Sequence, residues 1–354
     1  MNDFGNDKKS AVQAKYDAQK IAFGPIMFQA AKGLRDFGIL KLLLKNKQGK
    51  SIVEISEELK ISVYGVKVML EAGLSMEMVY LENNNYRITK TGFFIESDEL
   101  TKVNMNFTHD VNYLGFFDFN ESIKTGKPSG LKALGKWDTV YEGLSELPKD
   151  IQKSWFDFDH FYSDTAFPEL MEIVFKKGGR KVLDIGGNTG KFSIKCAGYN
   201  PDNQMTILDL PGQVAMANDN IKKAGFSDRI KTHGINLLDA SKPFPKGHNT
   251  IWMSQFLDCF SQEEILTLLQ RSYDALDENG SLFILETYWD RQKYEASTYS
   301  LHATSLYFTC IANGNSQMYH SEDMIKLIDK ANMKIVNDYN NIGVSHTLFE
   351  VKKK

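Results

Sequence analysis

The sequence lacks three things that mark a secreted, membrane or nucleic-acid-binding protein: paired cysteines, long apolar runs and excess positive charge. Three widely spaced cysteines in 354 residues form neither a disulfide framework nor a zinc motif. No window approaches the roughly 18 apolar residues of a membrane span, and the start, "MNDFGNDKKSAVQAKYDAQK", lacks the apolar segment of a secretion signal. With a net charge of −3, the chain has no excess of positive charge that would favour binding to nucleic acid or anionic lipid. We therefore expect a cytoplasmic protein with no nucleic-acid or membrane partner.

The length of the chain, 354 residues, exceeds what one ordinary hydrophobic core supports, so more than one domain is expected. Changes in pattern along the chain place an N-terminal domain at residues 1–100, a helical linker at 101–176 and a C-terminal domain at 177–354. Each part has its own periodicity and composition.

The N-terminal part has the element order of a winged helix. Residues 11–48 carry apolar side chains at helical spacing, a second helix follows Ser51 as N-cap, and a third covers residues 63–74. The stretch "MVYLENNNYRITKTGFFI" then predicts two short strands around an Asn-rich turn.

The charge of this part argues against DNA as its partner. Residues 50–90 hold five basic and six acidic side chains, and the third helix is mostly apolar. DNA binding needs neutralised phosphates before any base can be read. An apolar, slightly acidic helix instead favours a protein interface, so we expect homodimerisation.

The segment 107–167 is rich in aromatic residues, with 13 Phe, Tyr or Trp in 61 positions against 12% for the whole chain. One interpretation is a helical layer packed on the next domain. The other is that some of these rings line a pocket for a flat substrate. Both remain open at this stage.

From about residue 180, short β-rich runs alternate with helical stretches, which predicts βαβ units and a parallel sheet. The tail from residue 333 predicts an antiparallel hairpin at one edge of that sheet. The expected strands are "KVLDIG", "QMTILDL", "RIKTHGIN", "NTIWMSQF" and "SLFILETYW".

The first of these strands runs into a glycine turn, "LDIGGNTGKF", and then a helix, so backbone N–H groups face a ligand there. The turn lacks the G-x-G-x-x-G spacing of a dinucleotide site, because Asn188 stands in place of the second Gly. Asp184 before the turn suits a cationic ligand better than a phosphate, although it could also only brace the turn. Asp209, at the end of the second strand, can accept hydrogen bonds from a ribose.

These motifs resemble the class I S-adenosylmethionine-dependent methyltransferases, and within them the small-molecule O-methyltransferases of plants and bacteria. "VLDIGGNTG", "ILDLPGQVAMA" and "ALDENGSLFILE" carry the resemblance, which covers most of the chain after residue 20. It implies a Rossmann-like α/β domain with a mostly parallel seven-stranded sheet and an antiparallel edge hairpin, preceded by a mainly α winged-helix dimerisation domain. It also implies S-adenosylmethionine as cofactor and a hydroxyl of a small aromatic molecule as methyl acceptor.

The resemblance assigns residues to the cofactor. The expected contacts come from the glycine turn and from the ends of the second, third and fourth strands: Asp184, Gly186, Gly187, Asn188, Gly190, Asp209, Leu210, Asn236, Leu237, Ser254 and Gln255. Asn236 stands where the family usually has an Asp beside the adenine, and its amide oxygen can still accept a hydrogen bond.

One departure concerns the general base. The family uses a His after strand four, whereas "FLDCFSQEEI" places Asp258 there. A carboxylate of ordinary pKa is about six units too acidic to be a good base for a phenol. Burial could raise the pKa of Asp258, the acceptor hydroxyl could itself be acidic, or the base could lie elsewhere. Asp258 could also only cap the following helix.

Glu286 matches the family acid that flanks the missing His, and Gln317 or Met318 stands where a third acid is usual. We take Asp258, Glu286 and His302 as the catalytic candidates, with His109 as a further substitute for the missing His. The candidate acceptor-binding residues are His109, Trp155, Phe158, Tyr162 and Tyr288. No group of side chains has metal-ligand spacing, so no metal is expected.

Two other functions remain as alternatives. The missing His is compatible with a degenerate S-adenosylmethionine-binding sensor that no longer catalyses transfer. A nicotinamide oxidoreductase is disfavoured by the acid before the turn and by the broken glycine fingerprint.

Overall fold

A computed structural model describes residues 4–176 and 180–354 of the chain. These fall into two compact units that meet between Thr108 and His109. The linker expected at residues 101–176, which contains the aromatic-rich segment, is thus mostly part of the C-terminal unit. The other expected boundary, between residues 176 and 177, adjoins residues 177–179, which lie outside the described residues.

In the N-terminal unit the three stretches expected to be helical precede the expected hairpin, although the first of them is divided into several helices. Ser51 and Glu54 form a reciprocal capping box at the start of α4, and Ser62 caps α5. Its elements are α1 (Ala11–Ala22), α2 (Gly24–Asp36), α3 (Ile39–Lys45), α4 (Ile52–Leu59), α5 (Val63–Ser75), β1 (Val79–Glu82), β2 (Asn85–Ile88), α6 (Lys90–Ser97) and α7 (Glu99–Phe107).

The stretch 11–48, expected as helical, forms three helices in the structure. Breaks fall before Gly24–Pro25 and at Gly38, whose φ of 79° suits the left-handed conformation that glycine adopts readily. The core of the unit joins α2, α3, α4 and α5 through side chains such as Leu34, Leu43 and Leu70. No residue of α1 is buried.

The C-terminal unit opens with a helical layer. Its helices are α8 (Phe119–Thr125), α9 (Val140–Gly143), α10 (Lys149–Asp164) and α11 (Phe167–Phe175), with short 3₁₀ turns between them. Most of the Phe, Tyr and Trp residues of the aromatic-rich segment 107–167 lie in this layer, and α10 carries several of them along its length.

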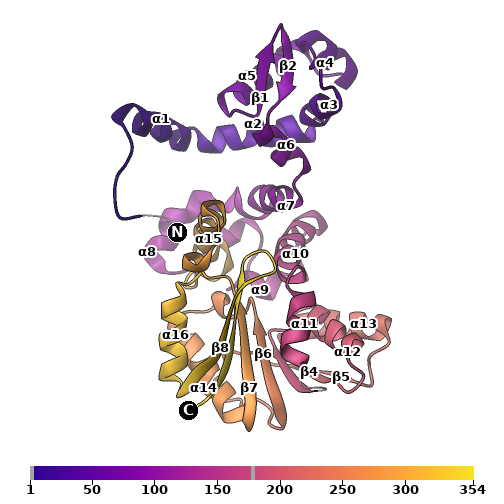
Figure 1. Cartoon of the computed structure of the whole chain (residues 1–354), viewed down its shortest axis with the longest axis vertical. Helices are drawn as coiled ribbons and strands as arrows, with labels where there is room; N and C mark the ends of the chain where they lie inside the picture. The colour runs from indigo at the N-terminus through magenta and orange to yellow at the C-terminus, as the bar shows by residue number, and fades with distance from the viewer. Residues whose placement is uncertain (1–3, 177–179) are drawn as a thin grey trace. The chain divides into compact units, whose positions relative to one another are not determined.

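A seven-stranded sheet follows, with the strand order β5-β4-β3-β6-β7-β9-β8. The first five strands in this order run parallel, and β9 and β8 pair antiparallel, which confirms the edge hairpin (Figure 1). The strands are β3 (Lys181–Ile185), β4 (Gln204–Asp209), β5 (Ile230–Gly234), β6 (His248–Ser254), β7 (Leu276–Glu286), β8 (Met333–Ile342) and β9 (His346–Lys353).

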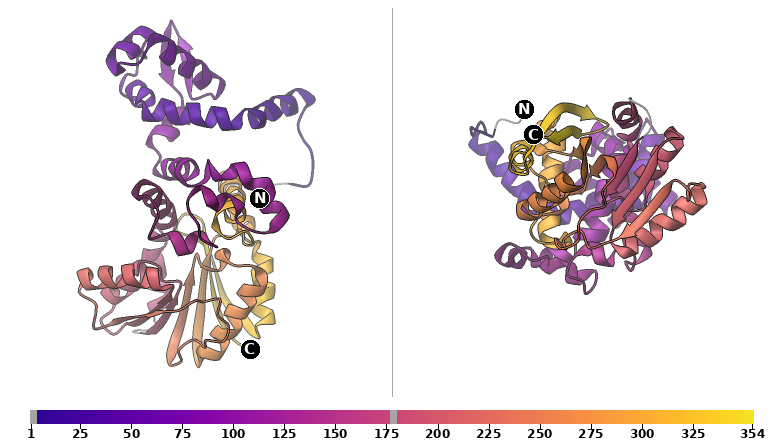
Figure 2. Two further views of the ribbon diagram at one scale, coloured as in Figure 1. Left: turned by 180° about the vertical axis from the view of Figure 1, so that it is seen from behind. Right: turned by 90° about the horizontal axis from the view of Figure 1, so that it is seen from below.

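Helices cover both faces of this sheet, as the views from behind and below also show (Figure 2). On one face, α14 (Gln262–Ala275) and α16 (Ser321–Lys330) pack on the inner strands, and α11, α12 (Lys191–Tyr199) and α13 (Pro211–Ala224) cover the other. This arrangement of helices on both faces of a mostly parallel sheet is the Rossmann-like fold expected from the sequence. Its strands are buried on both sides, which is why they are continuous apolar runs in the sequence.

One expected boundary was wrong. The stretch "SQEEILTLLQRSYDALDENG" was expected to be helical to its end, but α14 stops at Ala275 and β7 begins at Leu276. Leu276 pairs with His248 on β6, so a tertiary contact extends the strand into residues that have turn character in isolation.

Within residues 4–176 and 180–354, no helix has both the length and the apolar character to cross a membrane.

Candidate active site

The glycine turn after β3 has a backbone that few side chains would allow. Gly186 has a φ of 75°, and a Cβ there would lie 2.2 Å from the ring of Phe256. A Cβ on Gly187 would lie 2.8 Å from Ile207. Asn188 also has positive φ, at 48°, although it is not glycine. Such strain in a non-glycine residue is typical of functional sites.

Gly190 has a structural role in the turn. Its φ of 80° starts α12, and it lines neither cavity described below. Its expected place in the cofactor site is therefore indirect: it turns the chain so that the preceding residues, Gly186 to Thr189, face the cavity.

Asp184 lies beneath this turn and is almost fully buried, at 2% exposed. Its carboxylate accepts a hydrogen bond of 2.5 Å from the Ser193 hydroxyl, at the start of α12. Burial raises the pKa of Asp184 to about 7, while the Ser193 bond works in the opposite direction. Asp184 thus braces the strand–turn–helix joint and also borders a small cavity at the turn.

Asp209, at the end of β4, holds the turn from the other side. Its Oδ2 accepts the backbone N–H of Asn188 and its Oδ1 accepts that of Leu210, each at 2.7 Å. Burial raises the pKa of Asp209 to about 6, and these two hydrogen bonds oppose the rise. The carboxylate is therefore fixed in one orientation at the cavity wall.

A cavity of about 300 Å³ opens above the carboxyl ends of the strands, where ligands of open α/β sheets bind. One half is formed by the turn, β4, and the segments after β5 and β6: Gly186, Asn188, Asp209, Leu210, Gln213, Asn236, Leu237, Leu238, Gln255 and Phe256. The other half is largely aromatic and polar. It includes Tyr141, Trp155, Phe158, Asp159, Tyr162, Asp258, Cys259, Thr304, Tyr307, Phe308, Asn313 and Met318.

The smaller cavity, of about 70 Å³, adjoins the turn. Its wall includes Asp184, Gly186, Gly187, Asn188, Thr189, Ser254 and Gln255. All the expected cofactor residues except Gly190 thus border one cavity or the other.

Two buried amide oxygens at the first half of the large cavity have no hydrogen-bond partner in the structure: Oδ1 of Asn188 and Oε1 of Gln213. Unsatisfied buried acceptors are costly, so each is a position where a donor from a ligand would be stabilised. Asn236 differs, because its Oδ1 already accepts the backbone N–H of Leu238 at 3.0 Å.

Gln255 has a φ of 47°, the second strained non-glycine residue beside the cavity. Its side-chain Oε1 lies 2.9 Å from Nε2 of His346, the first residue of β9. His346 is fully buried, and burial lowers its pKa to about 4, so its ring is neutral near pH 7. No local pattern connects these two residues, which are 91 positions apart in the chain.

Asp258 lies in a 3₁₀ turn, Leu257–Cys259, that directly follows the cavity residues Gln255 and Phe256, and Asp258 also lines the cavity. Burial raises its pKa to about 7, although a contact of 3.5 Å from the Cys259 thiol opposes the rise. The helix that follows is capped by Ser261, which forms a capping box with Glu264. Capping of this helix therefore does not account for Asp258.

Glu286 lies behind this wall and does not border the cavity. Its Oε1 accepts the backbone N–H groups of Phe256 and Leu257 at 3.0 and 2.8 Å, and its Oε2 has no hydrogen-bond partner. Burial, and then the charge of Asp258, raise the pKa of Glu286 well above its usual range. Glu286 is therefore placed to position the turn that carries Asp258, and not to touch an acceptor.

The acceptor candidates divide into two groups. Trp155, Phe158 and Tyr162 line the cavity, and the Trp155 Nε1–H donates to the Tyr307 hydroxyl at 2.8 Å. The expectation for Tyr288 was wrong, because its ring is buried 5.3 Å from that of Phe349, away from the cavity. Neighbouring residues at a strand end point in opposite directions, and here Thr287 lines the cavity in its place.

The two histidine candidates also lie outside the cavity. On α15 (Glu295–Tyr307), the buried face carries Leu301, Thr304 and Tyr307, so His302 points outward, with its ring 5.0 Å from that of Trp289. His109 pairs with the Asp110 carboxylate at 2.8 Å instead. Neither therefore replaces the base that the family motif provides.

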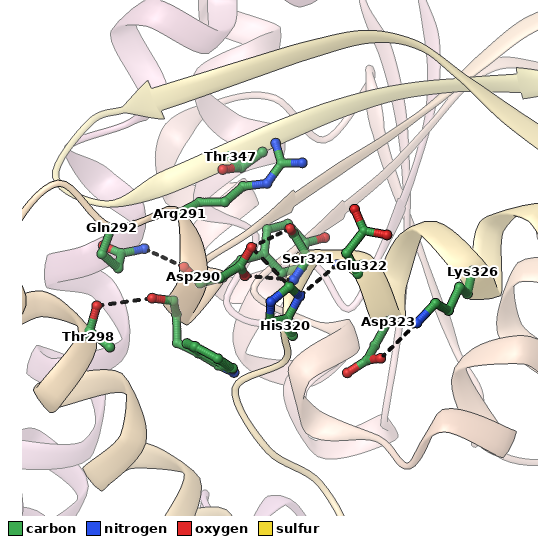
Figure 3. A network of polar contacts seen from close by, with 12 residues as sticks. Asp290, Arg291, Gln292, Thr298, His320, Ser321, Glu322, Asp323, Lys326 and Thr347 are labelled. Carbon is green, nitrogen blue, oxygen red and sulfur yellow. Dashed lines mark hydrogen bonds and ion pairs between the residues drawn. The ribbon is translucent and has the colours of Figure 1, made fainter. Parts of the chain in front are cut away.

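A polar network holds the segment after β7 that borders the site (Figure 3). Asp290 accepts hydrogen bonds from the backbone N–H and the hydroxyl of Ser321, at 2.7 and 2.6 Å, and so anchors this segment to the start of α16. The Thr298 hydroxyl donates to the carbonyl of Trp289 at 3.0 Å and joins the segment to α15. These contacts fix the helix that carries Thr304 and Tyr307.

Asp159 and Gln213 are site residues that the sequence reasoning missed. Asp159, on α10, borders both cavities and accepts a hydrogen bond of 3.1 Å from the Asn188 side chain. An acid within the aromatic run "SWFDFDHFYSDTAF" was the only available signal.

Among the described residues, no group of three or more His, Cys, Asp or Glu side chains could hold a metal ion.

Two family models match the chain: a Dimerisation2-like domain at residues 15–86 and an O-methyltransferase domain at residues 166–332. The chain belongs to the class I S-adenosylmethionine-dependent O-methyltransferases. The resemblance inferred from the glycine turn and Asp209 is thereby confirmed, as is S-adenosylmethionine as the cofactor.

This methyltransferase is similar to two curated enzymes. It is 28% identical over 271 residues to L-tyrosine C(3)-methyltransferase of Streptomyces lavendulae, across 75% of this chain and 73% of that enzyme. It is 29% identical over 179 residues to 3-hydroxy-5-methyl-1-naphthoate 3-O-methyltransferase of Streptomyces sahachiroi, across 51% of this chain and 50% of that enzyme.

A solved structure shares the fold of the methyltransferase at low sequence identity. It is an O-methyltransferase from neocarzinostatin biosynthesis, NcsB1, in complex with S-adenosylmethionine and 2-hydroxy-5-methyl naphthoic acid. The TM-score is 0.66 at 15% identity, with 92% of this chain and 96% of that chain covered.

The cavity of the methyltransferase fits this cofactor. Asp209 would accept from the ribose hydroxyls, and the unpartnered oxygens of Asn188 and Gln213 would accept from other donors of the molecule. Leu210 and Leu237 offer apolar surface for the adenine. When bound, S-adenosylmethionine supplies an electrophilic methyl group on a sulfonium.

Proposed function

We propose that this protein transfers a methyl group to a hydroxyl of a small aromatic acceptor, with Asp258 as the group that accepts or orients the hydroxyl proton. The observation that carries the proposal is the position of Asp258. Its buried carboxyl lines the cavity two residues after Phe256, which lines the half assigned to the cofactor, on a turn held by Glu286.

The surroundings of Asp258 support a role in proton transfer. A pKa raised to about 7 by burial reduces the mismatch with a phenol of pKa about 10 from six units to about three. Asp258 would receive the hydroxyl proton as the oxygen gains the methyl group, and would return it to solvent afterwards. Holding the acceptor against Trp155 and Phe158 supplies the alignment that an in-line displacement needs.

A ring carbon beside a phenolic hydroxyl is a second candidate acceptor atom. The similarity to an L-tyrosine C(3)-methyltransferase favours it, because a phenolate is nucleophilic at that carbon as well as at oxygen. The carbon would then lose its ring proton after the new bond forms. The same carboxylate could accept a proton in either reaction.

The test is transfer of labelled methyl groups to a panel of phenols and naphthols, with products assigned by NMR. O-methyl or ring C-methyl products that Asp258→Asn forms much more slowly would support the proposal. Tight cofactor binding with no transfer to any member would instead favour the sensor alternative.

Homodimerisation through the N-terminal unit is part of the proposal. The Dimerisation2-like match and an α1 without buried residues both support it. We also propose a cytoplasmic location, which the absence of disulfides among Cys196, Cys259 and Cys310 supports.

A further inference from the structure

The segment that follows β5 forms part of the cavity wall. Asn236, Leu237 and Leu238 line the half of the large cavity that is assigned to the cofactor. They belong to the stretch 236–246, which has neither helix nor strand and joins β5 to β6. Without a regular hydrogen-bond ladder, the form of this stretch depends on contacts with the rest of the domain.

A buried arginine on α14 holds the middle of the 236–246 stretch. The guanidinium of Arg271 donates through Nη1 to the carbonyl of Leu237, and through Nη2 to the carbonyl of Lys242 at 2.6 Å. Its Cζ also lies 4.0 Å from the centroid of the Phe244 ring. One side chain thus ties three points of the stretch to α14.

These three contacts use the geometry of a guanidinium. Its planar fork presents two donors to two carbonyls at once, and its flat face packs on an aromatic ring. The carbonyl that Nη1 holds belongs to Leu237, so the bond fixes the peptide that links two residues of the cavity wall, Leu237 and Leu238. A lysine at the same position could reach one carbonyl at a time.

Arg271 itself does not border a ligand site. Its side chain is 8% exposed and lines neither cavity. Burial lowers the pKa of Arg271, and the charge of Asp239 opposes this effect. A buried cation is costly, and Nε of Arg271 has no hydrogen-bond partner to offset part of that cost. The contacts that Arg271 does make go to the stretch that carries the cavity wall.

We propose that Arg271 is a positioning residue for the nucleoside end of S-adenosylmethionine. By holding the carbonyls of Leu237 and Lys242 and the ring of Phe244, it keeps the wall formed by residues 236–238 in its binding form before the cofactor arrives. A preformed wall spares the ligand the entropy cost of ordering it. This rests on the proposed function, since it concerns the cofactor half of the same site.

The chain offers a matched control at the other edge of the sheet. Arg229, just before β5, donates through Nη1 to the carbonyls of Asn200 and Pro201 at 3.2 and 3.1 Å, and its Cζ lies 5.0 Å from the Phe226 ring centroid. It therefore makes the same kinds of contact as Arg271. The residues that Arg229 holds precede β4 and line neither cavity.

The experiment measures S-adenosylhomocysteine binding to full-length Arg271→Met and Arg229→Met by calorimetry, with the Tm of each ligand-free variant recorded. We expect Arg271→Met to bind about five- to twentyfold more weakly than the unchanged protein, because two hydrogen bonds that order the wall are lost. Arg229→Met should keep its affinity within twofold. Unchanged affinity in Arg271→Met, or equal losses in the two variants, would overturn the inference.

Arg271→Lys tests the need for the fork and keeps the experiment decisive if Arg271→Met does not fold. We expect its affinity to lie between those of Arg271→Met and the unchanged protein, because lysine keeps the charge but only one carbonyl contact. Full affinity in Arg271→Lys would overturn the role of the fork. With an acceptor that the enzyme methylates, the KM for S-adenosylmethionine should rise in Arg271→Lys while kcat stays nearly constant. A fall in kcat with an unchanged KM would contradict a role in positioning the cofactor.

The binding measurements separate this inference from the proposed function, since they need no methyl transfer. Asp209→Ala is measured beside the arginine variants as a test of the cofactor pocket itself. If Asp209→Ala loses affinity and Arg271→Met does not, only the role of Arg271 is wrong. If all these variants bind as the unchanged protein does, the pocket is placed wrongly and both proposals fail.

Discussion

The imidazole Nε2 of His346 lies 2.9 Å from Oε1 of Gln255, so the first residue of β9 fixes the amide of a strained residue at the cavity. The ring of His346 is buried and neutral. An amide oxygen can only accept, so Nε2–H donates to Oε1 of Gln255, and the amide NH₂ group of Gln255 points away from the imidazole. His346 lines neither cavity, so it would act on the proposed cofactor site through Gln255 and not by direct contact.

Replacing His346 with Leu should weaken S-adenosylhomocysteine binding about three- to tenfold, because the Gln255 amide loses its fixed orientation. Calorimetric titration measures the change. His233→Leu on β5, where the ring is exposed, is the matched control and should leave affinity intact. Equal affinities for the two variants would show that Gln255 needs no such support.

Asp209→Ala should lower affinity for S-adenosylhomocysteine at least tenfold. The variant loses the acceptor for the ribose hydroxyls and also the hydrogen bonds to the N–H groups of Asn188 and Leu210. Asp202→Ala, an exposed acid shortly before β4, serves as control. An unchanged dissociation constant for Asp209→Ala would contradict the pocket described above.

The rate of methyl transfer should rise with pH and level off above about 7, because Asp258 must lose its proton to serve as a base. Asp258→Asn should lower kcat about 100-fold and remove this rise, with cofactor affinity nearly unchanged. The pH profile of kcat for both proteins provides the measurement. If the rise persists in the variant, the base lies elsewhere.

The same substitution should stabilise the protein at alkaline pH. The folded pKa of Asp258, about 7, lies above its unfolded value of about 3.9, so its stabilising contribution is complete below pH 4 and lost as pH rises to 7. The asparagine of Asp258→Asn cannot ionise, so the variant does not lose this stability as pH rises. The Tm of Asp258→Asn should therefore exceed that of the unchanged protein by more at pH 8 than at pH 5. Asp274→Asn, an exposed acid on α14, should show no such difference.

The N-terminal unit should self-associate through exposed apolar side chains. Val12, Ile21 and Ile26 are 82%, 80% and 67% exposed within the chain, on or beside a helix with no buried residue. Ile21→Lys with Ile26→Lys should shift sedimentation toward monomer, while Val344→Lys in the β8–β9 turn should not. A parent protein that sediments as a monomer would refute the dimer.

Much of the fold could be predicted from the sequence, because each element carries its own local signal. The helix expected after the glycine turn is α12, and the tail from residue 333 became the edge hairpin. The boundary of β7 could not be predicted, since Leu276 joins the strand through its pairing with His248. The side-chain direction of His302 likewise depended on which face of α15 is buried.

By itself, the sequence determined the family, the cofactor and the local form of the proposed cofactor site, because the turn from Asp184 to Gly190 and the acid at Asp209 are short motifs whose backbone geometry follows from their residues. Only the tertiary structure decided what surrounds it. Asp159 borders the cavity, and His346 contacts the cavity residue Gln255, from elements far apart in the chain. The burial that raises the pKa of Asp258 comes from packing that no local pattern encodes. A motif fixes a local conformation, whereas burial and charge at a site are sums over distant neighbours.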